Sequence, residues 1–116
     1  MDRSKVLASL SALSNEARLD LMRLLVVAGD DGLAAGKIGM ELGHSASRLS
    51  FHLGILAQAG LIRSRRVARN VIYSADFASL GGTISYLLRD CCMDHPQVHA
   101  CCTRAPPEAA TALLSE

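Results

Sequence analysis

All four cysteines of the 116-residue chain lie in one short stretch, CCMDHPQVHACC. Thiolates are soft ligands, so a cluster of them selects thiophilic ions. Three thiolates that meet at one corner suit a trivalent pyramidal ion such as arsenite or antimonite. The stretch therefore predicts a site in which three thiolates hold one such ion, chosen from Cys91, Cys92, Cys101 and Cys102.

The backbone around these cysteines has to bring them together. Neighbouring residues of a helix point about 100° apart, so two cysteines inside a continuous helix converge poorly. Pro96 disfavours helical geometry at His95, which predicts that the last helix ends near Met93 or Asp94. The chain can then turn back at Pro96 and carry either of the later cysteines to the earlier pair, and the sequence leaves open which of the two is the third ligand.

Other uses of the same thiols remain open. His95 and His99 with two thiolates would complete a tetrahedral site for zinc or cadmium. A redox switch would instead link Cys91 or Cys92 to the distal pair. A metal-buffering module and a small thiol-dependent reductase are further alternatives. The chain has no phosphate loop, no CxxC motif after a strand and no acid–base cluster, so we predict that it is not an enzyme.

Composition favours a small helical domain. Half of the residues are hydrophobic but only 3% are aromatic, so the core must be built from aliphatic side chains. We expect one folded domain over residues 1–94 and a cysteine-bearing tail over residues 95–116. No segment resembles a signal peptide, and the longest apolar run, Leu24–Ala28, is too short to span a bilayer. We therefore expect a cytoplasmic protein whose thiols are reduced.

The stretch SASRLSFHLGILAQA, from Ser45 to Ala59, has two distinct helical faces. Leu49, Leu53 and Leu56 fall on one face at helical spacing. The opposite face carries short polar groups, a ring and an arginine, namely Ser47, Phe51, Gly54, Gln58 and the flanking Arg48. Two β-like runs with a tight connection follow. The pattern predicts a DNA-reading helix and a hairpin, with Ser47, Arg48 and Phe51 toward the bases.

Charge along this part of the chain is one-sided. No acidic residue lies between Leu42 and Ala75, although the formal net charge of the whole chain is only +1. The same window contains five arginines, namely Arg48, Arg63, Arg65, Arg66 and Arg69. Such a local excess attracts a phosphate backbone, so we predict that Arg65 and Arg66 contact DNA. The plainer alternative is a solvated charge cluster on a surface hairpin.

Further helices are predicted on both sides of this stretch. Apolar stripes indicate helices over 4–13, about 15–28 and 34–42, and a last one after Asp76. His44 is expected to be an exposed turn residue. The stripes of the first and last helices, the latter including Ile84 and Leu87, exceed what one small domain can bury. They predict a dimer interface.

This order of elements resembles the ArsR/SmtB family of small bacterial repressors. Three segments carry the resemblance: LSNEARLDLMRLL with Arg18, the pattern SxxxxSxHLxxLxxAGLI from Ser45 to Ile62, and RRVARNVIYS. The match covers roughly residues 5–90. Where the family has a glycine near the wing tip, this chain has Ala68, and we expect Asn70 to supply the positive φ there.

The resemblance implies a mainly α winged helix-turn-helix homodimer with a small β-wing. Such a dimer binds operator DNA when it is unliganded and leaves it when an inducer binds. Ser50 and His52 match positions on the family's DNA-binding helix, and Arg69 matches its wing.

Family members sense different ions with different residues. The CxC motif of one arsenic-sensing type and the Asp and His pairs of the zinc-sensing type have no counterpart here. This chain looks like the type with a vicinal cysteine pair at the end of the last helix and a further cysteine after it. The resemblance thus implies a repressor released by trivalent arsenic or antimony.

Overall fold

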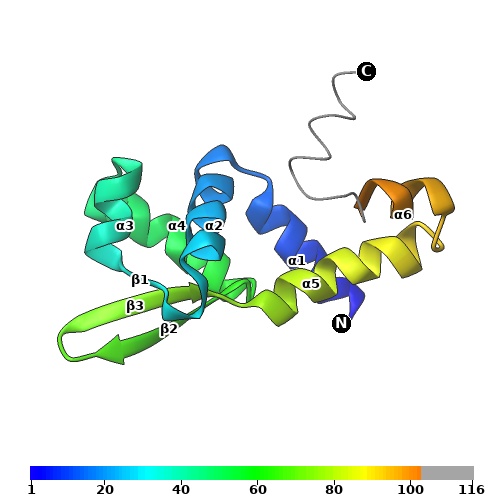
Figure 1. Cartoon of the computed structure of the whole chain (residues 1–116). Coiled ribbons are helices and arrows are strands. Elements are labelled where there is room, and N and C mark those ends of the chain that lie inside the picture. Colours follow the sequence, from blue (N-terminus) through cyan, green and yellow to red (C-terminus); the bar gives the residue numbers. More distant parts are fainter. Residues whose placement is uncertain (103–116) are drawn as a thin grey trace, which may run out of the picture. The chain divides into compact units, whose positions relative to one another are not determined.

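The computed structural model describes residues 1–102. Of the tail predicted over residues 95–116, residues 103–116 lie outside the described part. The elements in chain order (Figure 1) are α1 (Arg3–Leu13), α2 (Glu16–Ala28), a 3-10 turn η1 (Gly29–Asp31), β1 (Leu33–Ala34), α3 (Ala35–Leu42), α4 (Ala46–Gln58), β2 (Ile62–Val67), β3 (Asn70–Ala75), α5 (Phe77–Tyr86), a π-helical segment η2 (Leu87–Cys91) and α6 (Pro96–Cys102). The prediction of a mainly α chain with a small β-wing is confirmed.

Four of the helices, α1, α2, α4 and α5, begin where a polar side chain can satisfy a free backbone N–H group. The carboxylate of Asp2 accepts from the Lys5 N–H at the start of α1, and Asn15 does the same at the start of α2. The Ser45 hydroxyl accepts from the backbone of α4, and Asp76 accepts from the first turn of α5. Short polar side chains at these positions stabilise a helix N-terminus.

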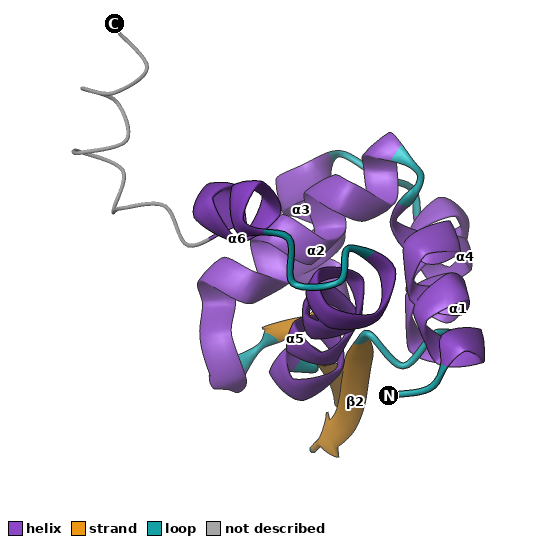
Figure 2. Cartoon of the chain, turned by 90° about the vertical axis from the view of Figure 1, so that its right-hand side faces the viewer, coloured by secondary structure: helices purple, strands orange, loops and turns teal. Residues whose placement is uncertain are grey.

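One hydrophobic core holds the first four helices and the sheet together. α1 and α4 lie side by side (Figure 2), and α2 packs against both. Leu21 and Leu25 of α2 are fully buried together with Leu56 of α4 and Leu61. The predicted inner face of α4 is confirmed, because Leu49 and Leu53 join the same core. This packing leaves the other face of α4 toward solvent.

The wing is part of a three-stranded antiparallel sheet with the order β1-β3-β2. β2 and β3 form the predicted hairpin, which projects from the helices in Figure 1. β1 adds a two-residue edge, where Leu33 pairs with Tyr73. The chain reaches it through Gly32, whose φ is 69° and where a Cβ atom would collide with the Tyr73 carbonyl oxygen. Two residues are too few to show alternation, so the sequence did not predict this strand.

The wing tip corrects one expectation. Val67 pairs with Asn70 across the hairpin, so the connection consists of Ala68 and Arg69. Ala68 itself takes the left-handed conformation with φ 55°, and Asn70 does not. The expectation that Asn70 supplies the positive φ was wrong, because Asn70 is already the first paired residue of β3.

The described chain forms two compact units that divide within α5, after Thr83. In the second unit, the end of α5 continues into η2, and Met93 and Asp94 then take positive φ values of 53° and 55° before α6 begins at Pro96. The boundary expected after residue 94 stays a prediction. None of the helices over residues 1–102 is long and apolar enough to cross a membrane.

Candidate nucleic-acid interface and thiol cluster

The outer face of α4 is exposed, as its two-faced pattern predicted. Ser47, Arg48 and Ser50 are exposed, and Phe51 is 63% exposed, which is high for so large an apolar side chain. The turn before α4 is closed by Gly43, which ends α3 in the left-handed conformation with φ 68°. The helix therefore presents an arginine, hydroxyls and a ring, which are groups that bind base edges and thymine methyl groups.

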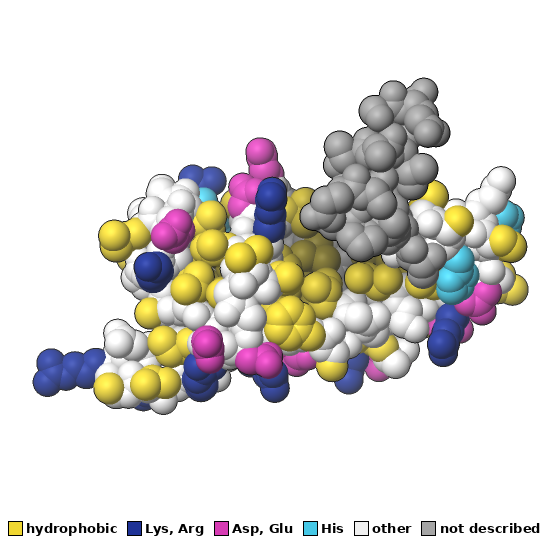
Figure 3. Space-filling view, viewed as in Figure 1, with side chains coloured by type: hydrophobic (Ala, Val, Ile, Leu, Met, Phe, Trp, Pro, Cys, Tyr) yellow, Lys and Arg dark blue, Asp and Glu magenta, His cyan; other side chains and the backbone are white. Residues whose placement is uncertain are grey.

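The wing carries the remaining predicted basic residues. Arg66 and Arg69 are exposed on or beside the hairpin, and Figure 3 shows Lys or Arg side chains projecting from its tip. Arg65 is also exposed, but its guanidinium donates to the carbonyl oxygens of Asp30 and Asp31 at 3.3 and 2.7 Å. The wing thus presents positive charge at its tip, and one arginine nearer its base is bonded to the η1 turn.

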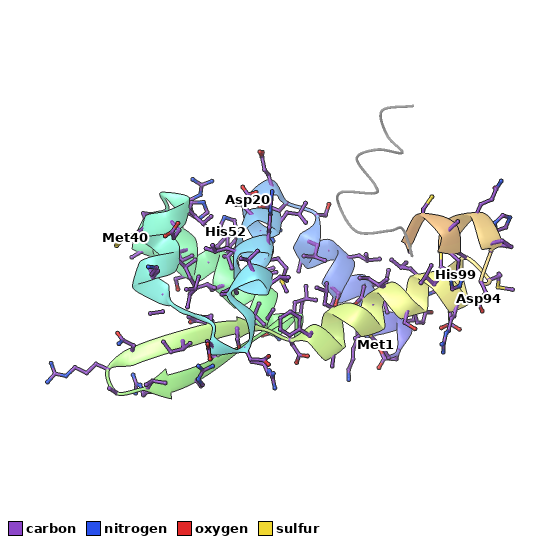
Figure 4. The ribbon with its side chains drawn as sticks, viewed as in Figure 1. Met1, Asp20, Met40, His52, Asp94 and His99 are labelled. Atoms are coloured by element: carbon purple, nitrogen blue, oxygen red, sulfur yellow. The ribbon has the colours of Figure 1, made fainter. Side chains whose placement is uncertain are left out.

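His52 lies on the inner side of α4. Its ring is only 7% exposed, and its Nδ1 lies 3.2 Å from a terminal guanidinium nitrogen of Arg18 (Figure 4 labels His52). Its place therefore favours a role in holding α4, and a direct contact with DNA stays a prediction. His44 is not the exposed turn residue expected. It is half-buried, and its ring lies 5.9 Å from that of His52 on α4.

The four thiols lie at the end of η2 and in α6, and all are free. Cys91 is the last residue of η2, and the Cys92 N–H donates to the Leu87 carbonyl oxygen at 2.9 Å. That bond spans five residues, which is the π-helical pattern and is common at functional sites. Cys92 is half-buried, whereas Cys91, Cys101 and Cys102 are exposed.

The turn between η2 and α6 is fixed by its own polar groups. The His99 ring bonds to the Asp94 carboxylate at 2.8 Å, and both residues lie at this turn in Figure 4. The Gln97 N–H donates to the His95 ring at 3.2 Å. The chain does turn back near Pro96, as expected, but it does so at Met93 and Asp94, and Pro96 then starts a helix that the sequence reading did not foresee.

The thiols influence one another unequally. Partial burial, a hydrogen bond with Cys91, and the proximity of Cys91 and Cys102 all raise the pKa of the Cys92 thiol. Cys101 makes no such contribution. Within residues 1–102, no group of three or more His, Cys, Asp or Glu side chains is arranged to hold a metal ion. In the described residues of the free chain, Cys92 thus interacts with Cys91 and Cys102, but the thiols do not form ligand geometry.

Sequence reasoning missed the residues that support these groups. The sequence shows Arg18 only as part of a family motif, yet Arg18 joins α1, α2 and α4. Asp94 was read as a helix end, yet it bonds to His99. The available signal for the pair of Arg18 and His52 was that both residues lie in segments that match the family pattern.

Together, the helix-turn-helix pair α3 and α4, the sheet and the projecting hairpin define a winged helix-turn-helix DNA-binding protein. The family model for a helix-turn-helix domain matches residues 13–65. Transcriptional activator HlyU from Vibrio cholerae is 33% identical over 89 residues, which cover 77% of this chain and 80% of HlyU. The chain belongs to the ArsR/SmtB family of winged helix-turn-helix transcriptional regulators, and it is not an enzyme.

Solved structures agree with this assignment. An ArsR-like transcriptional regulator from Rhodococcus sp. RHA1 has a TM-score of 0.70 and 27% identity, covering 84% of this chain and 89% of that chain. Reduced HlyU from Vibrio cholerae has a TM-score of 0.60 and 32% identity, over 74% of this chain and 87% of that one. A homodimeric winged helix-turn-helix DNA-binding domain from Mycobacterium bovis shares the fold, with a TM-score of 0.58 and 23% identity over 75% and 84% of the two chains.

Proposed function

We propose that this regulator is a cytoplasmic repressor that binds operator DNA as a homodimer and leaves it when trivalent arsenic or antimony binds its thiolates. α4 and the wing would contact DNA through Ser47, Arg48, Ser50, Phe51, Arg65, Arg66 and Arg69. The inducer would be held by Cys91, Cys92 and one distal thiolate, for which we choose Cys102 over Cys101.

The DNA part of the proposal rests on the outer face of α4 and the wing. α4 has no acidic residue, and its exposed groups are those that bind base edges. The arginines of the hairpin supply charge for phosphates on either side of the groove. HlyU is named a transcriptional activator. Repression by this chain is therefore our own inference, and it rests on the family resemblance and on the predicted release by an inducer.

Dimerisation is supported by apolar side chains that the single chain leaves exposed. On α1, Leu7 is 58% and Leu10 is 37% exposed, and on α5, Ile84 is 46% exposed. Burial of apolar surface is the dominant favourable contribution to most protein–protein association. A twofold dimer presents its recognition helices about 34 Å apart, which matches successive major grooves. The related domain from Mycobacterium bovis is homodimeric.

The inducer part rests on one observation, the proximity of Cys92 to both Cys91 and Cys102. The donor chemistry fits a thiophilic trivalent ion, which forms strong bonds to soft thiolates. Because no group in the described residues is arranged to hold a metal ion, the thiols have to shift relative to one another before three thiolates can meet. Such a shift gives the bound state a different structure from the free state. Coupling to DNA requires that the inducer prefer the DNA-incompetent arrangement.

Oxidation is the second candidate for the signal. All four thiols are free, three of them are exposed, and Cys92 lies near Cys102. A related structure is that of HlyU in a reduced state, which makes thiol oxidation a relevant comparison. Zinc or cadmium, held by His95, His99 and two thiolates, is the remaining alternative.

The deciding experiment measures DNA binding with and without each signal. A duplex would be selected by the protein from a randomised pool, and its affinity followed by fluorescence anisotropy at fixed salt. We expect arsenite to release the duplex, and zinc or peroxide to leave it bound. Release by peroxide alone would favour the redox alternative, and release by zinc alone would favour the tetrahedral site. Absence of any selected duplex would contradict the DNA-binding assignment.

A further inference from the structure

Arg18 connects three helices through one side chain. Its Nε donates to the carbonyl oxygen of Ala12, near the end of α1, at 2.6 Å. A terminal guanidinium nitrogen lies 3.2 Å from Nδ1 of His52 on α4. Its backbone N–H donates to the Asn15 side chain that caps α2. Arg18 thus links α4 to both α1 and α2 through one side chain.

The hydrogen bond between Arg18 and His52 specifies the charge state of the ring. A guanidinium group has only donors, so Nδ1 of His52 must accept and the ring must be neutral, with its proton on Nε2. A protonated ring would lose the acceptor and would place a second positive charge beside Arg18. Burial, then the charges of Arg18 on α2, Arg48 on α4 and His44 in the preceding turn, lower the pKa of His52.

His52 also contacts the outer face of α4. Its ring meets the edge of the Phe51 ring at a centroid distance of 5.4 Å, and Phe51 is 63% exposed. On the other side, it lies 5.9 Å from the ring of His44 in the turn that leads into α4. A displacement of the His52 ring would therefore reach both the exposed ring and the turn.

We propose that Arg18 is a positioning residue for DNA binding, which acts through the neutral ring of His52 to hold α4 in its DNA-binding orientation, and that protonation of His52 releases this hold. The inference rests on the proposed role of α4. It predicts an unusual sign of the pH effect. Protonation of exposed histidines adds positive charge and strengthens binding to phosphate. Protonation of this buried ring adds no phosphate contact and breaks the link to Arg18, so acidification should weaken binding.

The test is the pH profile of DNA affinity at constant ionic strength, from about pH 7.5 to about pH 5.5, across the ordinary range of histidine titration. Wild-type affinity for the selected duplex should fall about fivefold over this range, toward the tenfold limit set by a difference of about one pKa unit between the two orientations. His52→Asn places an acceptor oxygen where Nδ1 lies but does not titrate. It should bind within about threefold of wild type at the higher pH and lose the decline.

A second variant tests the other partner. Arg18→Met keeps the apolar stem but removes the donors, so it should bind DNA about tenfold more weakly at the higher pH. Its circular dichroism should match that of wild type. The His52 ring, followed by NMR, should titrate nearer the ordinary histidine range in this variant, since the charge and the hydrogen bond of Arg18 are gone.

The outcomes separate this inference from the proposed function. Wild-type affinity that holds or rises on acidification, or an equal decline in His52→Asn, would overturn the positioning role. A protein that selects no duplex would overturn the proposed function. In that case the NMR titration still decides the link, because an unchanged His52 pKa in Arg18→Met would overturn it.

Discussion

Arg65 on β2 donates from its guanidinium to the carbonyl oxygen of Asp31 at 2.7 Å, so the wing is bonded to the turn that follows α2. A second bond from the same group reaches the Asp30 carbonyl at 3.3 Å. A guanidinium held in this way has fewer donors left for a phosphate than one at the wing tip. The arginines of the wing should therefore contribute to DNA binding unequally.

The first prediction compares Arg69 with Arg65. Each arginine that neutralises one phosphate steepens the dependence of log affinity on log salt by about 0.9. Arg69→Ala should weaken binding to all duplexes and reduce this slope by about that amount. Arg65→Ala should change the slope less but raise amide hydrogen exchange in β2 and β3, because the bond to η1 is lost. Equal slopes for wild type and Arg69→Ala would contradict a phosphate contact at the tip.

The second prediction concerns Arg48, which is exposed in the first turn of α4. An arginine that reaches a guanine edge contributes about 1–3 kcal/mol of discrimination against other bases. Arg48→Ala should therefore relax the base preference at one position of the selected duplex as well as lower affinity. Duplex selection repeated with the variant measures this. An unchanged preference with lower affinity would show that Arg48 contacts only phosphate.

The third prediction concerns the dimer. Ile84 is 46% exposed in the single chain and belongs to the stripe predicted to form the interface. Ile84→Glu should give monomers, because a partner would have to bury an unpaired charge. Met40 on α3 is 86% exposed and lies off this stripe, so Met40→Glu is the matched control and should remain dimeric. Light scattering distinguishes the two, and a dimeric Ile84→Glu protein would contradict the stripe.

The fourth prediction is the pH dependence of folding. Burial and the Arg18 charge lower the pKa of His52 in the folded state, so the unfolded chain binds the proton more tightly. The contribution of neutral His52 to the free energy of unfolding is therefore present above pH 6.5, the ordinary pKa of histidine. This contribution is lost as the pH falls from that value through the lower pKa of His52 in the folded state. The urea midpoint of wild type should therefore decrease on acidification more than that of His52→Asn. Parallel decreases would mean that other groups dominate.

The fifth prediction separates the two distal cysteines. Cys102 affects the pKa of Cys92, whereas Cys101 does not, so Cys102→Ser should abolish release of DNA by arsenite and Cys101→Ser should retain most of it. Cys91→Ser and Cys92→Ser should also abolish release without lowering DNA affinity. Because protonated thiols must lose protons to bind, wild type should release protons when arsenite is added. Normal release from Cys91→Ser would show that the inducer binds elsewhere.

Local patterns in the sequence were sufficient for the main helices and the hairpin, though not for β1 or α6. The caps at Asn15, Ser45 and Asp76 are formed by neighbouring residues in the chain, so their positions were predictable from residue type. The two faces of α4 follow from helical spacing alone, and the structure confirms Leu49 and Leu53 as core residues. The clustering of the cysteines was visible for the same reason, because all four lie close together along the chain.

Only the tertiary structure decided how distant residues meet. Arg18 and His52 are far apart in sequence, and so are Arg65 and Asp31, so no local period could pair them. The proximity of Cys102 to Cys92 likewise depends on how the chain folds between them. Local propensity specifies segments, whereas contacts between segments depend on packing that the whole chain determines together.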